Sequence, residues 1–172
     1  SSDDAAGIQL QAYCQGLIHA SRFENCHGGG AVGVDNAWLL FDASVIDSCS
    51  NTVGWGLGGG IGIGGYALAH VRDSQITNSI ARVGGALCTD IGSFVIESTL
   101  IANCSAVGYF LEGTALGGGI GLVAAAGIEA IVLRRNTRIV GCVAPKGGAI
   151  GMYGSGSSLR IEDSSMEHNE AT

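Results

Sequence analysis

The chain has 172 residues, of which 47% are hydrophobic and only 13% are charged. This balance excludes a disordered chain, and 30 glycines without a regular Gly-X-Y period exclude collagen. The net charge is −7 and Lys146 is the single lysine, which argues against nucleic acid as a partner. No transmembrane segment is expected, because glycines and Glu129 break the longest apolar stretch, residues 119–130.

A glycine-rich apolar element recurs along the chain and indicates an internal repeat. Its copies read, in chain order, AAGIQL, GGAVGV, GGGIGI, GGALCT, GGGIGL and GGAIGM. Intervals of 24, 29, 26, 33 and 30 residues separate their central aliphatic residues, which are Ile8, Val32, Ile61, Leu87, Ile120 and Ile150.

A second apolar element follows each copy and consists of a short strand, a small polar pair and an aliphatic or aromatic anchor. The anchors are Phe23, Ile46, Ile76, Ile101, Ile139 and Met166. Short alternating strands bounded by Gly, Asp, Ser and Thr favour β structure over helix. Because both motifs share one period, each repeat is expected to form one coil of a solenoid.

The predicted fold class is therefore all-β: a right-handed parallel β-helix of six coils, about 24–33 residues each. The coils are expected to start near residues 5, 29, 58, 84, 117 and 147 of a single segment, 1–172. Neither end carries a polar capping repeat, so we expect this segment to belong to a longer chain.

In the glycine-rich strands, bulky aliphatic residues alternate with Gly, Ala or Cys. If the aliphatic residues point inward, a nearly bare and uncharged face points outward; the opposite pleat would expose an apolar stripe. Such a face predicts docking of partner chains, although a narrow coil that simply needs small residues would also explain it. The predicted docking face consists of Ala31, Gly33, Gly60, Gly62, Ala86, Cys88, Gly119, Gly121, Ala149 and Gly151.

Charges of alternating sign occupy the position four residues before each anchor. The series is His19, Asp42, Arg72, Glu97, Arg134 (or Arg135) and Glu162, in which the fifth coil needs one bulged residue. Opposite charges stacked on an outer face favour one register of the coils. We therefore interpret this series as a salt-bridge ladder and not as a chance alignment.

Four of the six cysteines align three residues after the anchor, namely Cys26, Cys49, Cys104 and Cys142. They could form disulfides between adjacent coils, or an inward stack of free thiols that pack as small hydrophobic groups. Stacked parallel side chains orient poorly for the S–S dihedral angle, which favours the free thiols.

Two longer insertions carry the pattern Val-Gly-aromatic and are candidate ligand-binding loops. Trp55, Tyr109 and Phe110 could form an aromatic clamp for a sugar ring or a partner protein, or they could fold back over the solenoid.

The chain lacks a recognisable catalytic pattern. Glycoside hydrolysis needs carboxylates about 5–9.5 Å apart, and here Gly64 separates Asp35 from Asp90 between aligned coils. The histidines are scattered and the cysteines have no CxxC spacing, so we predict no catalytic residues, no metal site and no cofactor.

The glycine-rich elements and one anchor motif carry a family resemblance. Gly29-Gly30-Ala31-Val32, Gly84-Gly85-Ala86-Leu87 and Gly147-Gly148-Ala149-Ile150, with Met166-Glu167-His168-Asn169, resemble the repeats of polymorphic outer-membrane proteins. This resemblance implies cell-surface display, adhesion and self-association, and it supplies no catalytic residues.

The function expected from these observations is that of a non-catalytic structural or adhesive module in an extracellular or cell-surface assembly, such as a filament, coat or adhesin. Its partners would be other protein chains or further repeats of the same chain. The sequon Asn103-Cys104-Ser105 makes Asn103 a candidate glycosylation site. The alternative is a carbohydrate-binding or polysaccharide-active β-helix, similar to pectate lyases, that uses the aromatic loops.

Overall fold

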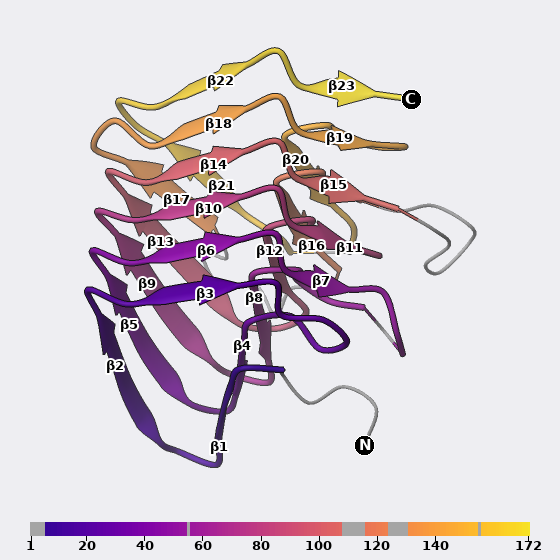
Figure 1. The fold of residues 1–172 in the computed structure, drawn as a ribbon. Coiled ribbons are helices and arrows are strands. Elements are labelled where there is room, and N and C mark those ends of the chain that lie inside the picture. Colours follow the sequence, from indigo (N-terminus) through magenta and orange to yellow (C-terminus); the bar gives the residue numbers. More distant parts are fainter. Residues whose placement is uncertain (1–5, 55, 108–115, 124–130, 155) are drawn as a thin grey trace.

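The protein is a parallel β-helix, which confirms the predicted fold class (Figure 1). A computed structural model describes residues 6–54, 56–107, 116–123, 131–154 and 156–172. The coils contribute successive strands to four parallel sheets, named A to D in the order in which the chain reaches them, and sheet D begins in the second coil. No α-helix occurs in these described ranges, and therefore none that could cross a membrane.

Sheets A and B contain one strand from every coil. Sheet A comprises β1 (Ile8–Gln11), β4 (Val32–Asp35), β8 (Ile61–Gly64), β12 (Leu87–Thr89), β16 (Ile120–Leu122) and β20 (Ile150–Met152). Sheet B comprises β2 (Gln15–His19), β5 (Trp38–Asp42), β9 (Leu68–Arg72), β13 (Ser93–Glu97), β17 (Ile131–Arg134) and β21 (Leu159–Ile161).

Sheets C and D follow sheet B along each coil. Sheet C comprises β3 (Arg22–Glu24), β6 (Val45–Asp47), β10 (Gln75–Thr77), β14 (Leu100–Ala102), β18 (Arg138–Val140) and β22 (Ser165–Glu167). Sheet D is built from two-residue strands, β7 (Ser50–Asn51), β11 (Ile80–Ala81), β15 (Ser105–Ala106), β19 (Val143–Ala144) and β23 (Glu170–Ala171).

The register between coils is the one that the two repeated motifs predict. The central aliphatic residues of the glycine-rich element pair in sheet A, as Ile8↔Val32↔Ile61↔Leu87↔Ile120↔Ile150. The anchors pair in sheet C, as Phe23↔Ile46↔Ile76↔Ile101↔Ile139↔Met166. Insertions between motifs therefore change the corners and loops without shifting the ladders.

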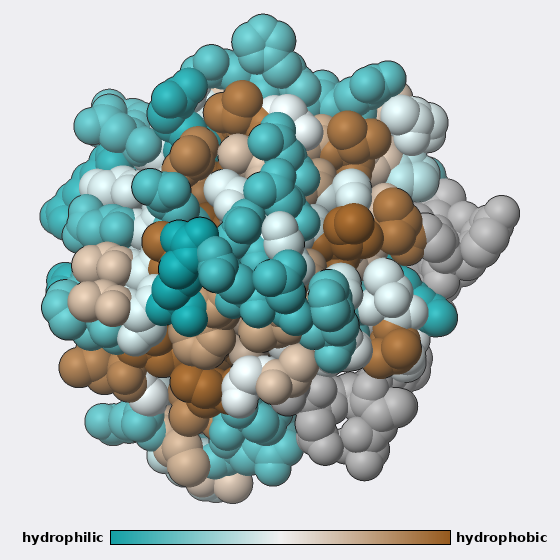
Figure 2. All heavy atoms as spheres, in the orientation of Figure 1, coloured by the Kyte–Doolittle hydropathy of each residue, from teal (hydrophilic) through white to brown (hydrophobic). Residues whose placement is uncertain are grey.

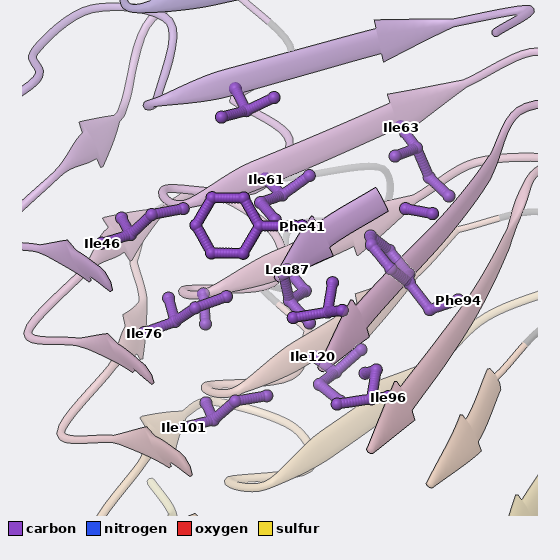
Figure 3. Close-up of a cluster of buried hydrophobic side chains, with 14 of the residues drawn as sticks. Phe41, Ile46, Ile61, Ile63, Ile76, Leu87, Phe94, Ile96, Ile101 and Ile120 are labelled. Atoms are coloured by element: carbon purple, nitrogen blue, oxygen red, sulfur yellow. The ribbon is translucent and has the colours of Figure 1, made fainter. Parts of the chain in front are cut away.

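The core is a column of stacked aliphatic and aromatic side chains from sheets A, B and C. Figure 3 shows Ile61 and Leu87 of sheet A, Phe41 and Phe94 of sheet B, and the sheet C anchors converging on the interior. These side chains are fully buried, except for the anchors of the two end coils, since Phe23 is half-buried and Met166 is exposed. At about 25 cal/mol per Å² of apolar surface removed from water, this column dominates the stability of the fold.

Every coil turns at the same two corners through a residue with φ between 44° and 63°. Between sheets B and C these residues are Ala20, Ala43, Asp73, Ser98, Arg135 (followed by Asn136) and Asp163. Between sheets C and D they are Asn25, Ser48, Asn78, Asn103, Gly141 and His168. Asn, Asp and Gly tolerate this left-handed conformation best, which explains their recurrence after the strands.

A ladder of hydroxyl groups fixes the corner between sheets B and C. Its members directly follow the left-handed residues and are Ser21, Ser44, Ser74, Thr99, Thr137 and Ser164. Ser44 Oγ donates to Asp42 O at 2.7 Å and accepts the N–H of Ser21 at 3.0 Å. The small polar pair of the repeat is thus a left-handed residue followed by a hydroxyl that satisfies the turn.

Candidate functional site

The predicted docking face on sheet A is wrong, because the chain itself covers it or turns it inward. The positions just before the central aliphatic residues do not alternate outward. Gly60 N–H and Ile61 N–H both donate to Ala86 O, at 2.8 and 3.0 Å. Two successive residues of one coil therefore bond to a single carbonyl of the next, as in a β-bulge. As a result Ala31 and Ala86 are buried in the core, and a Cβ on Gly60 or Gly119 would meet the Cγ2 atom of an anchor isoleucine. Ala149, in the last coil, packs partly buried against the same core.

The positions just after the central aliphatic residues face outward but lie under the segment that approaches each glycine pair. Its residues in successive coils include Leu57, Val83 and Leu116, and we call them together the cover segment. They form the isolated parallel bridges Leu57↔Val83 and Leu116↔Lys146. A Cβ on Gly62, Gly121 or Gly151 would lie 2.4–2.6 Å from an atom of this segment. Gly33, in the second coil, is covered by the side chain of Gln9.

Cys88 shows how complete this cover is. Its side chain is fully buried in a small apolar cluster with Val83, Leu116 and Val123. Burial raises the pKa of its thiol well above the ordinary range of cysteine. The uncharged face of sheet A is therefore the floor of a second, smaller core. The sequence signal for its cover was the apolar residue before three of the Gly-Gly pairs, namely Leu57, Val83 and Leu116.

The outer face of sheet B carries the residues of the predicted salt-bridge ladder in one row. His19, Asp42, Arg72, Glu97 and Arg134 are in register, and Glu162 follows at the end of β21. The extra residue of the fifth coil lies at the corner, where Ser98 N–H donates to the carbonyl oxygens of both Arg134 and Arg135.

Ion pairs divide this charged row into two clusters. In the first cluster, Arg72 Nε lies 2.8 Å from Asp42 Oδ1, and His19 Nδ1 lies 2.9 Å from Asp42 Oδ2. The Arg72 guanidinium holds the pKa of Asp42 below its usual range. At the end of the row Glu162 pairs with Arg160 of its own coil, with Arg160 Nη2 2.5 Å from Glu162 Oε1.

Glu97 is the centre of the second cluster and its side chain is only 5% exposed. It forms ion pairs with Arg134 and, at 3.3 Å, with Arg135, and it is hydrogen-bonded to His70 Nε2 at 2.9 Å. Burial alone would raise the pKa of Glu97, but the bonds from His70 and the arginines outweigh it, so that the pKa is lowered.

A row of mainly apolar side chains runs beside the charged row on the same face of sheet B. In register it consists of Leu17, Leu40, His70, Val95, Val132 and, in the last coil, Arg160. Leu17 is 68% exposed, and Leu40 and Val95 are half-buried. Val132 is buried, so the accessible part of this middle row is formed by Leu17, Leu40, His70 and Val95, beside the paired charges.

The aligned cysteines are free thiols and stack at the corner between sheets C and D. Cys49, Cys104 and Cys142 are buried, whereas Cys26 is half-buried. Each buried thiol lies 3.3–3.6 Å from the carbonyl oxygen two residues earlier, to which it donates. Burial raises the pKa of Cys49 to about 11, so this thiol remains protonated at neutral pH.

Cys104 and Cys142 lie in adjacent coils and share a hydrogen bond between their thiols. Hydrogen bonding to Cys142 and burial raise the pKa of Cys104, while the same bond lowers that of Cys142. In the remaining coils Ser79 and Asn169 take the place of cysteine: Ser79 Oγ donates to Thr77 O, and Asn169 Oδ1 accepts the Cys142 N–H at 2.9 Å. This position thus requires a small side chain that can form a hydrogen bond with the backbone at the turn.

Asp35 and Asp90, which the sequence separates by one coil, approach each other across Gly64. A Cβ on Gly64 would lie 3.5 Å from Asp35 Oδ1 and 3.7 Å from Asp90 Oδ1. Burial and, to a smaller extent, the charge of Asp35 raise the pKa of Asp90. Among the described residues, no three His, Cys, Asp or Glu side chains gather in a way that could hold a metal ion.

The candidate aromatic clamp lies outside the part of the chain that the structure describes, since Trp55, Tyr109 and Phe110 belong to residues 55 and 108–115. A different aromatic cluster, which the sequence analysis missed, lies at the corner between sheets A and B. It lines a cleft of about 310 Å³ with Tyr13, Trp38 and Tyr66. The candidate glycosylation site Asn103 is exposed at the corner between sheets C and D.

No family model, curated protein or solved structure matches this chain. The resemblance of its repeats to those of polymorphic outer-membrane proteins therefore has no support from a family match.

Proposed function

We propose that this β-helix is a non-catalytic structural module of an extracellular or cell-surface assembly, and that it associates through the outer face of sheet B. The observation that carries the proposal is the partly exposed middle row, with Leu17, Leu40 and Val95, beside the charged row. On sheet A the corresponding face is sealed by the cover segment. Surface display is supported by the resemblance of the repeats and by the exposed sequon residue Asn103.

The partner that fits this face best is a second copy of the chain. The charged row has an even number of positions, and from Asp42 to Glu162 its signs alternate. A two-fold axis parallel to the strands, placed between the third and fourth coils, reverses the order of the coils in the second copy. Each charge then faces its opposite, with Arg72 against Glu97 and Asp42 against Arg134 of the other copy.

The same rotation brings apolar groups of the middle row together. Val95 would face His70 and Leu40 would face Val132, which is already buried, while Leu17 would face Arg160; the dimer would therefore remove apolar surface mainly at Leu40 and Val95. Sheets that pack face to face lie about 10 Å apart with nearly aligned strands, which this arrangement allows.

Sheet C offers a contrast. On the face viewed in Figure 2, hydrophilic residues separate the hydrophobic ones, and no continuous apolar row is visible. Val45 is the matched residue there, since it is half-buried on the outer side of β6, as Val95 is on the outer side of β13.

The test is sedimentation velocity of the full chain over a concentration series. We expect a monomer–dimer equilibrium that Val95→Arg shifts to monomer and that Val45→Arg leaves unchanged. Circular dichroism should show that both variants keep the β structure. A wild-type chain that stays monomeric throughout the series, or equal effects of the two variants, would refute the proposed face.

A further inference from the structure

The cleft at the corner between sheets A and B is formed by a difference in corner length among the first three coils. Three residues join the strands in the first coil (12–14) and in the third (65–67), but only Asn36 and Ala37 join them in the second. The shorter middle corner leaves a notch between Tyr13 and Tyr66, and Trp38 begins the strand at its base.

Aromatic side chains are held at this notch although they remain largely in solvent. Tyr13 is 91% exposed and Tyr66 is 76% exposed, while Trp38 is 37% exposed. Monomeric scaffolds bury most large aromatic rings, so three exposed rings around one cleft indicate a binding surface.

Backbone bonds fix the points from which these rings extend. Tyr13 N–H donates to Asn36 O at 2.7 Å, and Tyr66 N–H donates to Asn36 Oδ1 at 3.3 Å. Asn36 Nδ2 in turn donates to Asp35 Oδ1 at 2.9 Å. The corner is therefore preorganised by the coil below and the coil above, which lowers the cost of ordering it around a ligand.

The remaining lining residues set the chemistry of the ligand. They are Cys14, Gln15, Asn36, Ala37 and Leu68. Among the described residues that line the cleft, none is charged, and amides and phenol hydroxyls provide both donors and acceptors. Aromatic platforms bordered by neutral hydrogen-bonding groups suit a ring that has C–H faces and a rim of hydroxyls, which is the character of a pyranose.

We propose that this corner binds a neutral glycan through one or two pyranose rings. A ring would lie over Trp38, with Tyr13 and Tyr66 on either side, because two coils separate the tyrosines by roughly 10 Å. The cleft of about 310 Å³ is at the lower end of the usual range for small-ligand sites. Acidic glycans are disfavoured by Asp35 behind the cleft and by the net charge of −7.

The cleft lies on the same outer face of sheet B as the proposed dimer contact, because Trp38 and Leu68 stand two residues before Leu40 and His70, but Val95 does not line it. The two proposals can therefore fail separately: Val95→Arg should leave glycan binding intact, and changes at Tyr13 or Tyr66 should leave sedimentation unchanged.

The experiment is titration of the full chain with cellohexaose, mannohexaose and N-acetylchitohexaose, and with hexagalacturonate as the acidic counterpart. Binding is followed by NMR through the indole N–H signals, and Trp55→Phe assigns the signal of Trp38. We expect at least one neutral probe to shift the Trp38 signal. The double variant Tyr13→Ser/Tyr66→Ser should weaken that binding by about tenfold or more.

Tyr153→Ser is the matched control, because Tyr153 is exposed at the same kind of corner in the last coil. Both variants should unfold at the wild-type denaturant concentration, since the substituted rings are exposed. The proposal is overturned if no neutral probe binds up to about 10 mM. It is also overturned if only the acidic probe binds, or if the double variant binds as wild type does.

Discussion

Sheets A and B belong to the same six coils, yet their outer faces have opposite characters. On sheet A the outward positions are mostly glycine, and the cover segment lies directly on them. On sheet B the outward positions carry paired charges and a row of mainly apolar side chains, of which Leu17 is exposed and Leu40 and Val95 are half-buried.

This contrast teaches how to interpret a face without charges on a solenoid. Glycine on sheet A allows a backbone segment to approach within van der Waals distance, and ionised groups there would be buried at a high cost in free energy. Missing charges therefore indicate coverage by the chain itself. Charges that alternate between coils indicate a face in contact with solvent, or with a partner that complements them.

The largest expected effect comes from adding volume under the cover segment. In Gly121→Val the new Cβ would lie 2.6 Å from Gly84 N and from Val83 Cγ1, so backbone must move. We expect a loss of about 3 kcal/mol or more in the free energy of unfolding. Ser93→Val makes a matched change on the half-buried outer side of β13 and should alter stability by less than about 0.5 kcal/mol. Urea denaturation measures both, and similar losses would contradict the contrast between the faces.

A smaller effect is expected from breaking the buried end of the charged row. Glu97→Gln removes the charge that pairs with Arg134, Arg135 and His70. The cost should be about 1–3 kcal/mol, since the arginines can regain water while charge-assisted bonds are lost. The control Glu167→Gln affects an exposed pair with Arg138, at 3.5 Å, and should change stability far less. If the two variants lose equal stability in urea denaturation, the burial of Glu97 has no energetic consequence.

The sequence was sufficient to predict the fold and its register because both depend on a repeated pattern. Each coil presents the same aliphatic and anchor positions, so aligning the copies already gives the contacts of Ile61 with Leu87 and of Ile76 with Ile101. The charged row followed from the same alignment.

The sequence did not reveal which faces are covered or where clefts open, because these depend on how corners bend. The strict alternation assumed for sheet A fails at Gly60 and Ile61, where two amides share one carbonyl. The cleft at Trp38 arises from a one-residue difference between corners, and the tyrosines that flank it are separated by two coils. Neither feature produces a repeated pattern along the chain.

The smallest expected effect separates the two faces by the sign of their pH dependence. On sheet B the pKa values of Asp42 and Glu97 are lowered, so their stabilisation exists above the ordinary carboxyl pKa and is lost as pH falls through the lowered values. At the edge of sheet A the pKa of Asp90 is raised, chiefly by burial. Its contribution is complete below the ordinary pKa and is lost as pH rises through the raised value.

Asp90→Asn should therefore be more stable than wild type at pH 7 and equal to it near about pH 3. Asparagine can still accept the N–H of Ile91 that Asp90 Oδ1 accepts at 2.6 Å, so the substitution mainly removes the charge. Glu97→Gln should behave in the opposite way, with its deficit at pH 7 shrinking in acid. Urea midpoints of the variants and wild type at both pH values test this. An Asp90→Asn variant that is less stable than wild type at both would show that the hydrogen bond of Asp90, and not its buried charge, determines its contribution to stability.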